Sequence, residues 1–366
     1  MFGNLLPSLV LLTSASIASV CPSGLVLQAD HRCHYDIRYL KQLGQTGLQK
    51  SFAHSDDGMD PQQIALGKLL FFDPILSRDK DLSCAHCHQP ARGFSDGLAQ
   101  SKAHGLSLPR SAPTLWNVAF SPALFWDGRA TNLEQQARGP LFSPAEMAMT
   151  PELIEKRLNQ IPEYRNLFLS TFESDYITAE NVISALASFE RTLVSFNSRY
   201  DRYVFGEPNA LNDEEVRGLN VFRSFVTRCT ECHTPPLFTN FQTAIIGVPD
   251  GNADPGMAKT TGETRLTGAF RVPTLRNIGL TAPYTHAGSF KTLADVVDFY
   301  DRGGGRHLPH PSAYLHWHIR EMGLSVEEKK ALVAFLLTLT DESLLPETPS
   351  RVPSGLKPLP GPHRPG

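Results

Sequence analysis

The feature that most constrains this chain is a cysteine motif that occurs twice, at residues 84–88 (CAHCH) and 229–233 (CTECH). C-x-x-C-H is the attachment signature of c-type haem, in which each thiol adds across a haem vinyl group. The histidine that follows ligates the iron from the proximal side. We therefore expect two covalently bound haem c groups, with His88 and His233 as iron ligands. The attachment residues would be Cys84, Cys87, Cys229 and Cys232.

Two other uses of these cysteines are less consistent with the spacing. Structural zinc sites usually bring their cysteine pairs closer together than the 145 positions between the motifs (229 against 84). A thioredoxin-like dithiol would be a single pair beside a βαβ unit, and no such unit is evident. Haem c is attached outside the cytoplasm, so the motifs also predict export.

The N-terminus fits that expectation. Residues 1–18 are interpreted as a signal peptide, because an apolar run is followed by small residues before Ser19, although no Lys or Arg precedes the run. We therefore expect a periplasmic protein. Cys21 resembles a lipoprotein cysteine, but Val20 suits that site poorly; a buried N-terminal segment is the third alternative. In an oxidising compartment, Cys21 and Cys33 would be able to form a disulfide.

Composition limits the class of protein. The chain has 366 residues, of which 41% are hydrophobic and 19% charged, enough apolar content for a sizeable core. The formal net charge is −3, so no basic excess exists to attract nucleic acid. No apolar run reaches the roughly 18 residues that a membrane-spanning helix needs.

Helical patterns dominate the chain. Thr178, Asn212 with Glu215, and Ser325 with Glu328 are typical helix starts before apolar residues at helical spacing. Alternation with a period of two is scarce, and 28 prolines and 27 glycines lie mostly between the helical segments. We predict a mainly α fold, with two cytochrome-c-like haem domains, long ordered loops and little sheet. No internal repeat is expected beyond the haem motif.

The predicted organisation has five parts. They are a signal peptide (1–18), an N-terminal extension (19–59), an N-terminal cytochrome c domain (60–192), a C-terminal cytochrome c domain (193–340) and a Pro-rich tail (341–366).

Several stretches resemble the bacterial di-haem cytochrome c peroxidase superfamily, which includes the MauG-type oxidases. The similarity runs from about residue 60 to about residue 341, in matching order and spacing. It is carried by residues 66–73 (LGKLLFFD), 125–130 (FWDGRA), 136–140 (QARGP), 146–147 (EM), 272–277 (VPTLRN) and 281–289 (TAPYTHAGS). The resemblance implies a peroxide-reactive haem in the N-terminal domain and a six-coordinate, electron-transferring haem in the C-terminal one.

The resemblance also assigns catalytic roles to three residues. Trp126 matches a tryptophan that relays electrons between the haems, and Gln136 and Glu146 match a pair near the peroxide-binding face. Cleavage of the O–O bond needs a base that moves a proton from the inner to the outer oxygen, and a polar group that steadies the developing charge. Without the resemblance, Trp126 would be interpreted as core packing and Glu146 as a solvated loop charge.

Tyr300 separates the two branches of the superfamily. It lies 14 positions after His286, where cytochrome c peroxidases place a methionine ligand and MauG-type enzymes a tyrosine. A phenolate is a hard anionic donor, which lowers the potential of the haem iron, whereas a thioether raises it. We expect Tyr300 to be the second ligand of the second iron; the alternative is an ordinary core aromatic on a helix that starts at Thr292.

Other family features match less well. The calcium site between the domains would use carbonyl oxygens of Thr281 and Pro283, but Ser111 replaces the family's asparagine. His104 lies one position from the place of a removable distal histidine, so we expect a five-coordinate first haem. Arg276 would pair with a haem propionate or lie at the surface. His307, His310, His316 and His318 are interpreted as surface histidines rather than a metal site.

The sequence therefore predicts a di-haem peroxidase that reduces hydrogen peroxide with electrons from a small periplasmic donor, either a cytochrome c or a cupredoxin. The alternative is a MauG-type oxidase, which would oxidise Trp or Tyr residues of a partner protein. A non-catalytic di-haem electron carrier is less consistent, since a carrier needs no acid–base pair at an open iron face. Family members are often dimers, so a homodimer is a further expectation.

Overall fold

A computed structural model describes residues 21, 25–27, 29, 33–37, 59–249, 254–308, 314–343 and 346–359. The predicted signal peptide and His310 lie outside this part of the chain. The chain divides into two compact units, Met1–Gly44 and Gln45–Gly366. No described helix is long and apolar enough to cross a membrane.

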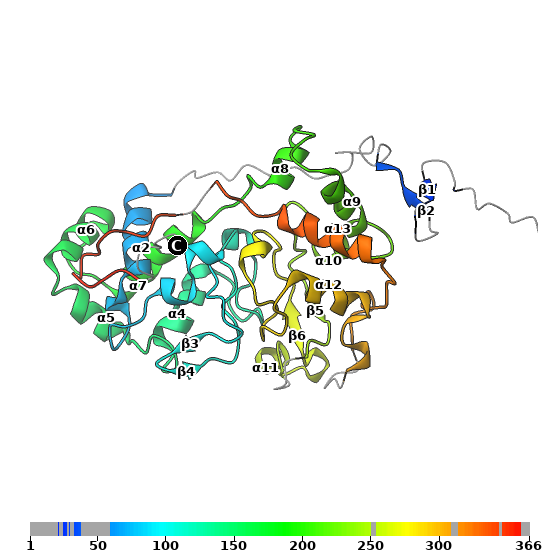
Figure 1. The fold of residues 1–366 in the computed structure, drawn as a ribbon. Helices are drawn as coiled ribbons and strands as arrows, with labels where there is room; N and C mark the ends of the chain where they lie inside the picture. Colours follow the sequence, from blue (N-terminus) through cyan, green and yellow to red (C-terminus); the bar gives the residue numbers. More distant parts are fainter. Residues whose placement is uncertain are drawn as a thin grey trace, which may run out of the picture. The chain divides into compact units, whose positions relative to one another are not determined.

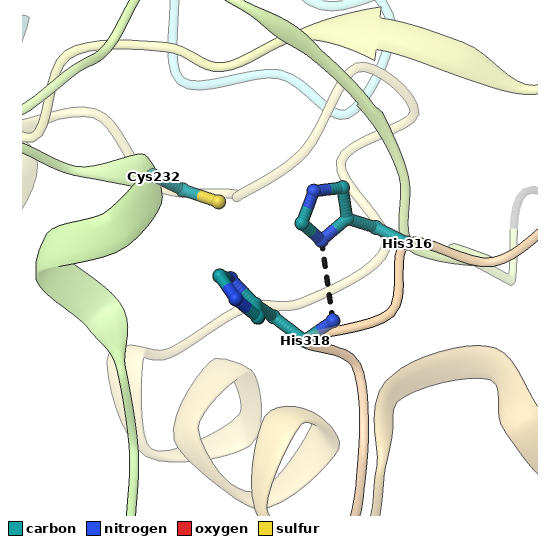
Figure 2. A group of neighbouring side chains, drawn as sticks. All are labelled: Cys232, His316 and His318. Carbon is teal, nitrogen blue, oxygen red and sulfur yellow. Dashed lines mark hydrogen bonds between the residues drawn. The ribbon is translucent and has the colours of Figure 1, made fainter. Parts of the chain in front are cut away.

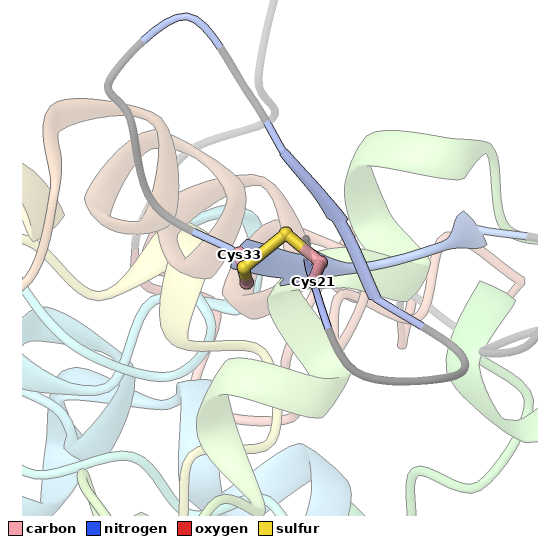
Figure 3. Close-up of a disulfide and its surroundings, with 2 residues drawn as sticks. All are labelled: Cys21 and Cys33. Carbon is pink, nitrogen blue, oxygen red and sulfur yellow. A yellow bond between two sulfur atoms is a disulfide. The ribbon is translucent and has the colours of Figure 1, made fainter. Parts of the chain in front are cut away.

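The first unit contains a short hairpin. Strands β1 (Leu25–Leu27) and β2 (Cys33–Tyr35) pair antiparallel, and Leu27 lies opposite Cys33. The predicted disulfide between Cys21 and Cys33 is confirmed, with a Cα–Cα distance of 5.6 Å (Figure 3). Because this bond uses the Cys21 sulfur, no thiol remains there for a lipid.

The second unit is mainly helical, as predicted, with two very short antiparallel sheets in its described residues (Figure 1). Its α-helices are α2 (Pro61–Phe72), α3 (Cys84–Cys87), α4 (Leu133–Phe142), α5 (Pro151–Leu158), α6 (Pro162–Phe172), α7 (Ala179–Arg191), α8 (Arg199–Val204), α9 (Asp213–Phe222), α10 (Cys229–Cys232), α11 (Ala258–Thr261), α12 (Leu293–Asp301) and α13 (Val326–Leu337). Its 3₁₀ turns are η1 (Pro74–Leu76), η2 (Pro90–Arg92), η3 (Val118–Phe120), η4 (Thr264–Leu266), η5 (Ile278–Leu280) and η6 (Gly304–His307). Its strands are β3 (Lys102–Ala103) with β4 (Leu106–Ser107), and β5 (Thr243–Ile245) with β6 (Ala269–Arg271).

The helix starts follow the predicted capping residues. The Thr178 side chain accepts a hydrogen bond from the Asn181 amide at the start of α7. Full capping boxes, in which side chain and backbone bond reciprocally, open α9, α12 and α13. These caps satisfy backbone N–H groups that the first helical turn leaves unpaired. Each haem motif follows one long helix, since α2 precedes α3 and α9 precedes α10.

The expectation of no further repeat is wrong. Residues 112–117 (APTLWN) recur as 272–277 (VPTLRN), 160 positions later (272 against 112), and each stretch leads into a 3₁₀ turn, an isolated bridge and a helix. Helix α4 therefore corresponds to α12. Only a few identities survive between the copies, which is why the sequence alone hides the repeat.

The two copies contact each other with approximate twofold symmetry. The Ser111 amide donates to the His286 carbonyl at 2.7 Å, and the Arg271 amide donates to the Trp126 carbonyl at 2.9 Å. Residues 271 and 286 lie 160 positions after residues 111 and 126, so the two bonds are reciprocal. The rings of Trp126 and His286 also meet edge to face, with centroids 6.3 Å apart. Equivalent residues thus contact one another at the seam between the two copies.

Each copy has its own helix pair. Gly67 on α2 allows close contact with α7, because a Cβ there would lie 1.9 Å from the Ala185 carbonyl oxygen. Gly218 on α9 does the same for α13, with the same 1.9 Å approach to the Ala331 carbonyl oxygen. The pairs α2–α7 and α9–α13 are therefore equivalent, and they match Ala185 of α7 with Ala331 of α13.

The Pro-rich segment has no helix or strand in its described part, yet it is tied to the first copy (Figure 1, red). Val352 is 1% exposed and belongs to the core that surrounds α2 and α7. Ser354 donates to the Asp73 carboxylate at 2.7 Å, and the Leu359 amide donates to the Phe72 carbonyl at 3.1 Å. We call residues 346–359 the C-terminal strap.

Candidate active site

Two cavities lie in the second unit, one at each C-x-x-C-H motif. The first has a volume of about 800 Å³ and is bordered by Cys84, Cys87 and His88. The second has a volume of about 280 Å³ and is bordered by Cys229, Cys232 and His233. Cavities of this order, with few polar groups among many apolar ones, are typical of small-molecule and cofactor sites.

The two motif histidines are held in the same way. His88 Nδ1 lies 2.9 Å from the Phe94 carbonyl oxygen, and His233 Nδ1 lies 3.0 Å from that of Phe238. A carbonyl only accepts, so Nδ1 carries the proton and Nε2 keeps its lone pair. Burial lowers the pKa of both imidazoles, against the opposing effect of these hydrogen bonds. Each ring is therefore a neutral, oriented donor suited to a metal.

The four cysteines fit the same group. Cys84, Cys87, Cys229 and Cys232 are not disulfide-bonded and lie on the one-turn helices α3 and α10 beside the cavities. Burial raises the pKa of each free thiol. Free cysteine pairs beside an apolar cavity would suit thioether attachment to the vinyl groups of a haem.

One group of side chains has the composition of a metal site. Ring nitrogens of His316 and His318 lie within 4.8 Å of the Cys232 sulfur and of one another (Figure 2). Cys232 belongs to the C-x-x-C-H motif, so thioether formation would use its sulfur. His316 and His318 border the second cavity, not a separate one, and are partly buried rather than surface residues. His307 is exposed and pairs with Glu321 at 2.9 Å.

Tyr300 and Pro140 occupy equivalent positions over the two cavities. Tyr300, on α12, borders the second cavity, where burial, followed by the nearby Cys232 and Cys229, raises the pKa of its phenol. Pro140, on α4, borders the first cavity 160 positions earlier. A proline side chain has no donor atom for a metal. At this position, the second copy has a side chain with a possible donor atom for a metal and the first copy does not.

The structure brings Gln136 and Glu146 together at the first cavity. Gln136 lies on α4, and Glu146 lies in the turn that follows this helix. Burial raises the pKa of the Glu146 carboxyl, opposed by a hydrogen bond from Ser143 and the charge of Arg129. A carboxyl whose pKa is raised by burial is suited both to accept a proton and to return it.

His104 supports Glu146 instead of entering the cavity. Its Nε2 lies 2.6 Å from the Glu146 carbonyl oxygen, and its Nδ1 lies 3.6 and 3.7 Å from the carboxylates of Asp79 and Asp81. The cavity lining includes Ala103 but not His104. The ring therefore acts as a support for the Glu146 turn.

Trp126 borders both cavities. Its indole N–H donates to the Ser111 carbonyl at 2.9 Å, which fixes the ring plane. Arg271, which also borders both cavities, is partly buried, and the desolvation of its guanidinium lowers its pKa to about 10. The ring of Trp126 thus lies at the seam of the repeat.

The remaining expectations concern Arg276 and the calcium site. Arg276 is neither at the surface nor available to a propionate: it is fully buried, and its guanidinium donates to the Asp201 carboxylate at 2.8 Å. Thr281 and Pro283 do border the second cavity. The Ser111 hydroxyl donates to the Thr285 carbonyl at 2.9 Å, so it is already in use.

Sequence reasoning missed two groups at the first cavity. Arg110 pairs with Asp127 at 2.8 Å and with Asp254 at 2.7 Å, which ties the two copies together beside Trp126. Glu190, on α7, also borders the cavity and has no counterpart in the resemblance. A search for the 160-residue repeat would have revealed the seam, and a comparison of α7 with α13 would have revealed Glu190.

Two equivalent cavities, each with paired cysteines and a neutral oriented histidine, are the design of a protein that holds two haems. The sequence model of di-haem cytochrome c peroxidase matches residues 61–209. The methylamine utilization protein MauG of Methylorubrum extorquens is 40% identical over 298 residues, covering 80% of this chain and 82% of that protein. The cytochrome c551 peroxidase of Nitrosomonas europaea is 38% identical over 282 residues, covering 76% and 79%.

Solved structures agree. A MauG-like protein associated with microbial copper homeostasis superposes with a TM-score of 0.75 at 32% identity, covering 84% of this chain and 98% of that one. The diheme peroxidase BthA of Burkholderia thailandensis gives 0.68 at 27% identity, covering 88% and 96%. The chain belongs to the di-haem cytochrome c peroxidase family and is a haem oxidoreductase.

Proposed function

We propose that this protein is a di-haem c-type peroxidase that reduces hydrogen peroxide at the first cavity, with electrons that arrive through the second. When bound, the haems supply an iron centre for peroxide and a second centre for electron transfer. The observation that carries the proposal is the asymmetry of the repeat. The first cavity has Gln136 and Glu146 but Pro140 where the second has Tyr300. The first cavity has residues that can transfer protons, and the second has a residue that can ligate iron.

Attachment and ligation follow from the donors. Cys84 and Cys87 would hold the first haem and Cys229 and Cys232 the second, all through thioethers. His88 would ligate the first iron through Nε2, because its Nδ1 is bonded to Phe94. His233 and Tyr300 would both ligate the second iron.

Glu146 is the proton carrier of the reaction. It accepts the proton of the inner peroxide oxygen and returns it to the outer oxygen, which leaves as water. Gln136 steadies the charge on the separating oxygens through its amide N–H groups. Reduction of one hydrogen peroxide to two waters uses two electrons and two protons; the donor supplies the electrons and solvent the protons.

Trp126 carries electrons across the seam. Its ring borders both cavities, and the Ser111 carbonyl accepts its indole proton. The polarised N–H···O bond favours brief oxidation of the ring, because partial negative charge lies next to the developing positive charge. Its position, and not its burial alone, supports the relay role.

A MauG-type oxidase is the second candidate, and Tyr300 is the observation that favours it. A phenolate ligand would lower the potential of the second iron and hinder electron uptake from an ordinary donor. Oxidising equivalents would then be shared and drawn out by Trp or Tyr residues of a partner protein. A pure electron carrier is less supported, because Glu146 and Gln136 would have no use in it.

Partners and location complete the proposal. The donor is a small periplasmic cytochrome c or cupredoxin, the protein is exported, and a homodimer is its expected assembly. Calcium at Thr281 and Pro283 also stays a prediction, and no step is routed through it. Calcium needs six to eight oxygen ligands, and the Ser111 hydroxyl is already bonded to Thr285. Metal analysis of the purified protein decides this point.

The test mixes the purified diferric holoprotein with hydrogen peroxide in a stopped-flow spectrometer, with and without a reduced small cytochrome. Rapid oxidation of the cytochrome supports the peroxidase. A long-lived oxidised species with little cytochrome turnover supports the oxidase. Absence of any spectral change at the haems contradicts both. Mass spectrometry before the experiment must show the added mass of two haem groups.

A further inference from the structure

We propose that Glu190 is a redox-linked proton carrier of the first cavity, whose carboxyl takes up a proton when the neighbouring iron gains an electron and releases it when the electron leaves. The proposal rests on the part of the proposed function that places a haem on His88. It does not depend on peroxide chemistry. Nothing in the proton steps assigned to Glu146 uses Glu190.

The position of Glu190 is unusual for a carboxyl. It lies near the end of α7, is 7% exposed, and borders the first cavity together with Leu186 one turn earlier. Its Oε2 atom is buried and has no hydrogen-bond partner among the described residues. An ionised carboxylate in such a place has a large desolvation cost that nothing nearby offsets fully.

The second copy shows which type of residue is sufficient for packing at this position. The matched glycine contacts equate Ala185 of α7 with Ala331 of α13, so Glu190 corresponds to Leu336, five positions further along in each helix. Leu336 also borders its own cavity. The same wall position is therefore apolar in the copy assigned to electron transfer and ionisable in the copy assigned to peroxide. A leucine suffices for the fold, so the carboxyl calls for another explanation.

The charged groups around Glu190 make its protonation state sensitive to a change of charge nearby. Its neighbour Arg191 is paired with Glu134 of α4 at 2.6 Å, which leaves little net positive charge for Glu190. Cys84 of α3 also faces Glu190, and its sulfur would not titrate once it forms a thioether. Burial raises the pKa of Glu190 to about 8, against the smaller opposing effect of Arg191 and with an added increase from Glu134. A carboxyl so close to half-protonation changes state when a nearby charge changes by one unit.

The coupling balances charge and atoms. When the first iron gains one electron from the donor protein, the Glu190 carboxylate gains one proton from solvent and becomes a carboxylic acid. When the iron loses that electron, the acid returns its proton to solvent. The net charge inside the buried cavity then stays constant, which avoids an uncompensated charge in a medium of low dielectric constant. By linkage, the potential of the first haem must depend on pH.

The test is a redox titration of the holoprotein at several pH values on either side of 8, followed by visible absorption. In the natural protein, the potential of the first haem is expected to fall as pH rises. In Glu190→Gln and Glu190→Leu that slope is lost or strongly reduced. The second haem is the internal reference and keeps its slope. Glu180→Gln, which removes an exposed carboxylate from the first turn of the same helix, is the control and keeps both slopes.

A reciprocal variant tests the same idea in the other copy. Leu336→Glu places a carboxyl at the equivalent wall position and is expected to give the second haem a new pH-dependent potential. An unchanged slope of the first haem in both Glu190 variants overturns the proposal. Since the readout is a potential and no peroxide is added, a protein that proves to be a carrier or an oxidase would still give a decisive result.

Discussion

Pro140 and Tyr300 stand at the same point of two copies of one supersecondary unit, 160 residues apart, each over its own cavity. A ring without a donor atom faces one C-x-x-C-H motif, and a phenol faces the other. On the proposed ligation, the first site stays open and Tyr300 closes the second. At this position the two copies differ by one side chain on each helix.

Pro140→Tyr should close the first site. A phenol on α4 would face the first iron as Tyr300 faces the second, and the reaction with peroxide should slow about tenfold or more, since the ligand must leave first. Visible and EPR spectra would show a second low-spin haem. Pro140→Ala, which adds no donor, is the control and should keep a high-spin signal. A high-spin first haem in Pro140→Tyr would contradict the assignment.

Glu146→Gln should remove the proton carrier while both haems stay bound. The rate of the peroxide reaction should fall by about 10² to 10⁴, the usual contribution of a positioned acid–base group. In the natural protein that rate should decline as pH falls through the pKa of Glu146, which burial raises, because only the carboxylate accepts a proton. This decline should be absent in the variant. Glu152→Gln, at an exposed helix start, is the control.

Trp126→Phe should keep both haems and slow electron transfer between them. Phenylalanine fills similar space but is harder to oxidise, and it cannot donate to the Ser111 carbonyl. We expect turnover with a reduced cytochrome to fall about tenfold, equivalent to about 1.4 kcal/mol of barrier. Trp116→Phe, at the buried tryptophan that packs on Phe94, is the matched control. Equal turnover in the two variants would argue against a relay.

Tyr300→Met should raise the potential of the second haem, because a thioether favours reduced iron and a phenolate favours oxidised iron. A redox titration measures the shift, and the near-infrared absorption of His/Met ligation identifies the new ligand. Tyr284→Phe, in the same cavity wall, is the control and should leave the potential unchanged. If the natural protein already shows His/Met spectra, Tyr300 is not a ligand.

Val352→Ala tests the C-terminal strap. Removing two buried methyl groups from the core around α2 and α7 should lower the free energy of unfolding by roughly 1–3 kcal/mol. Val326→Ala, at a position that is 73% exposed, should change it little. Denaturant unfolding followed by circular dichroism gives both values. Equal stabilities would show that the strap contributes no core packing.

The sequence predicted the helices because their caps and apolar spacing are local signals. Thr178 and the capping boxes of α9 and α13 start helices where the residues indicate. The haem motifs are also local, since five adjacent residues carry them. Family resemblance, and not spacing, supplied Glu146, Gln136, Trp126 and Tyr300, and their roles remain predictions.

What the sequence did not predict depends on contacts between distant residues. Arg276 was misjudged because its partner, Asp201, lies 75 positions away, and an arginine in a loop normally points to solvent. From the sequence, Glu190 resembles any charged residue on a helix. Its contrast with Leu336 becomes evident only when α7 is matched with α13. The repeat itself survives in backbone geometry, such as the positive φ angles of Asn117 and Asn277, more than in residue identity.

The C-terminal strap has a consequence for truncated chains. Val352 belongs to the core around α2 and α7, and the Leu359 amide bonds to Phe72 at the end of α2, 287 positions earlier in the chain (359 against 72). The core of the first copy is therefore complete only when residues 346–359 are present. A truncation before residue 346 would remove packing and backbone bonding from helices that lie far upstream in the chain.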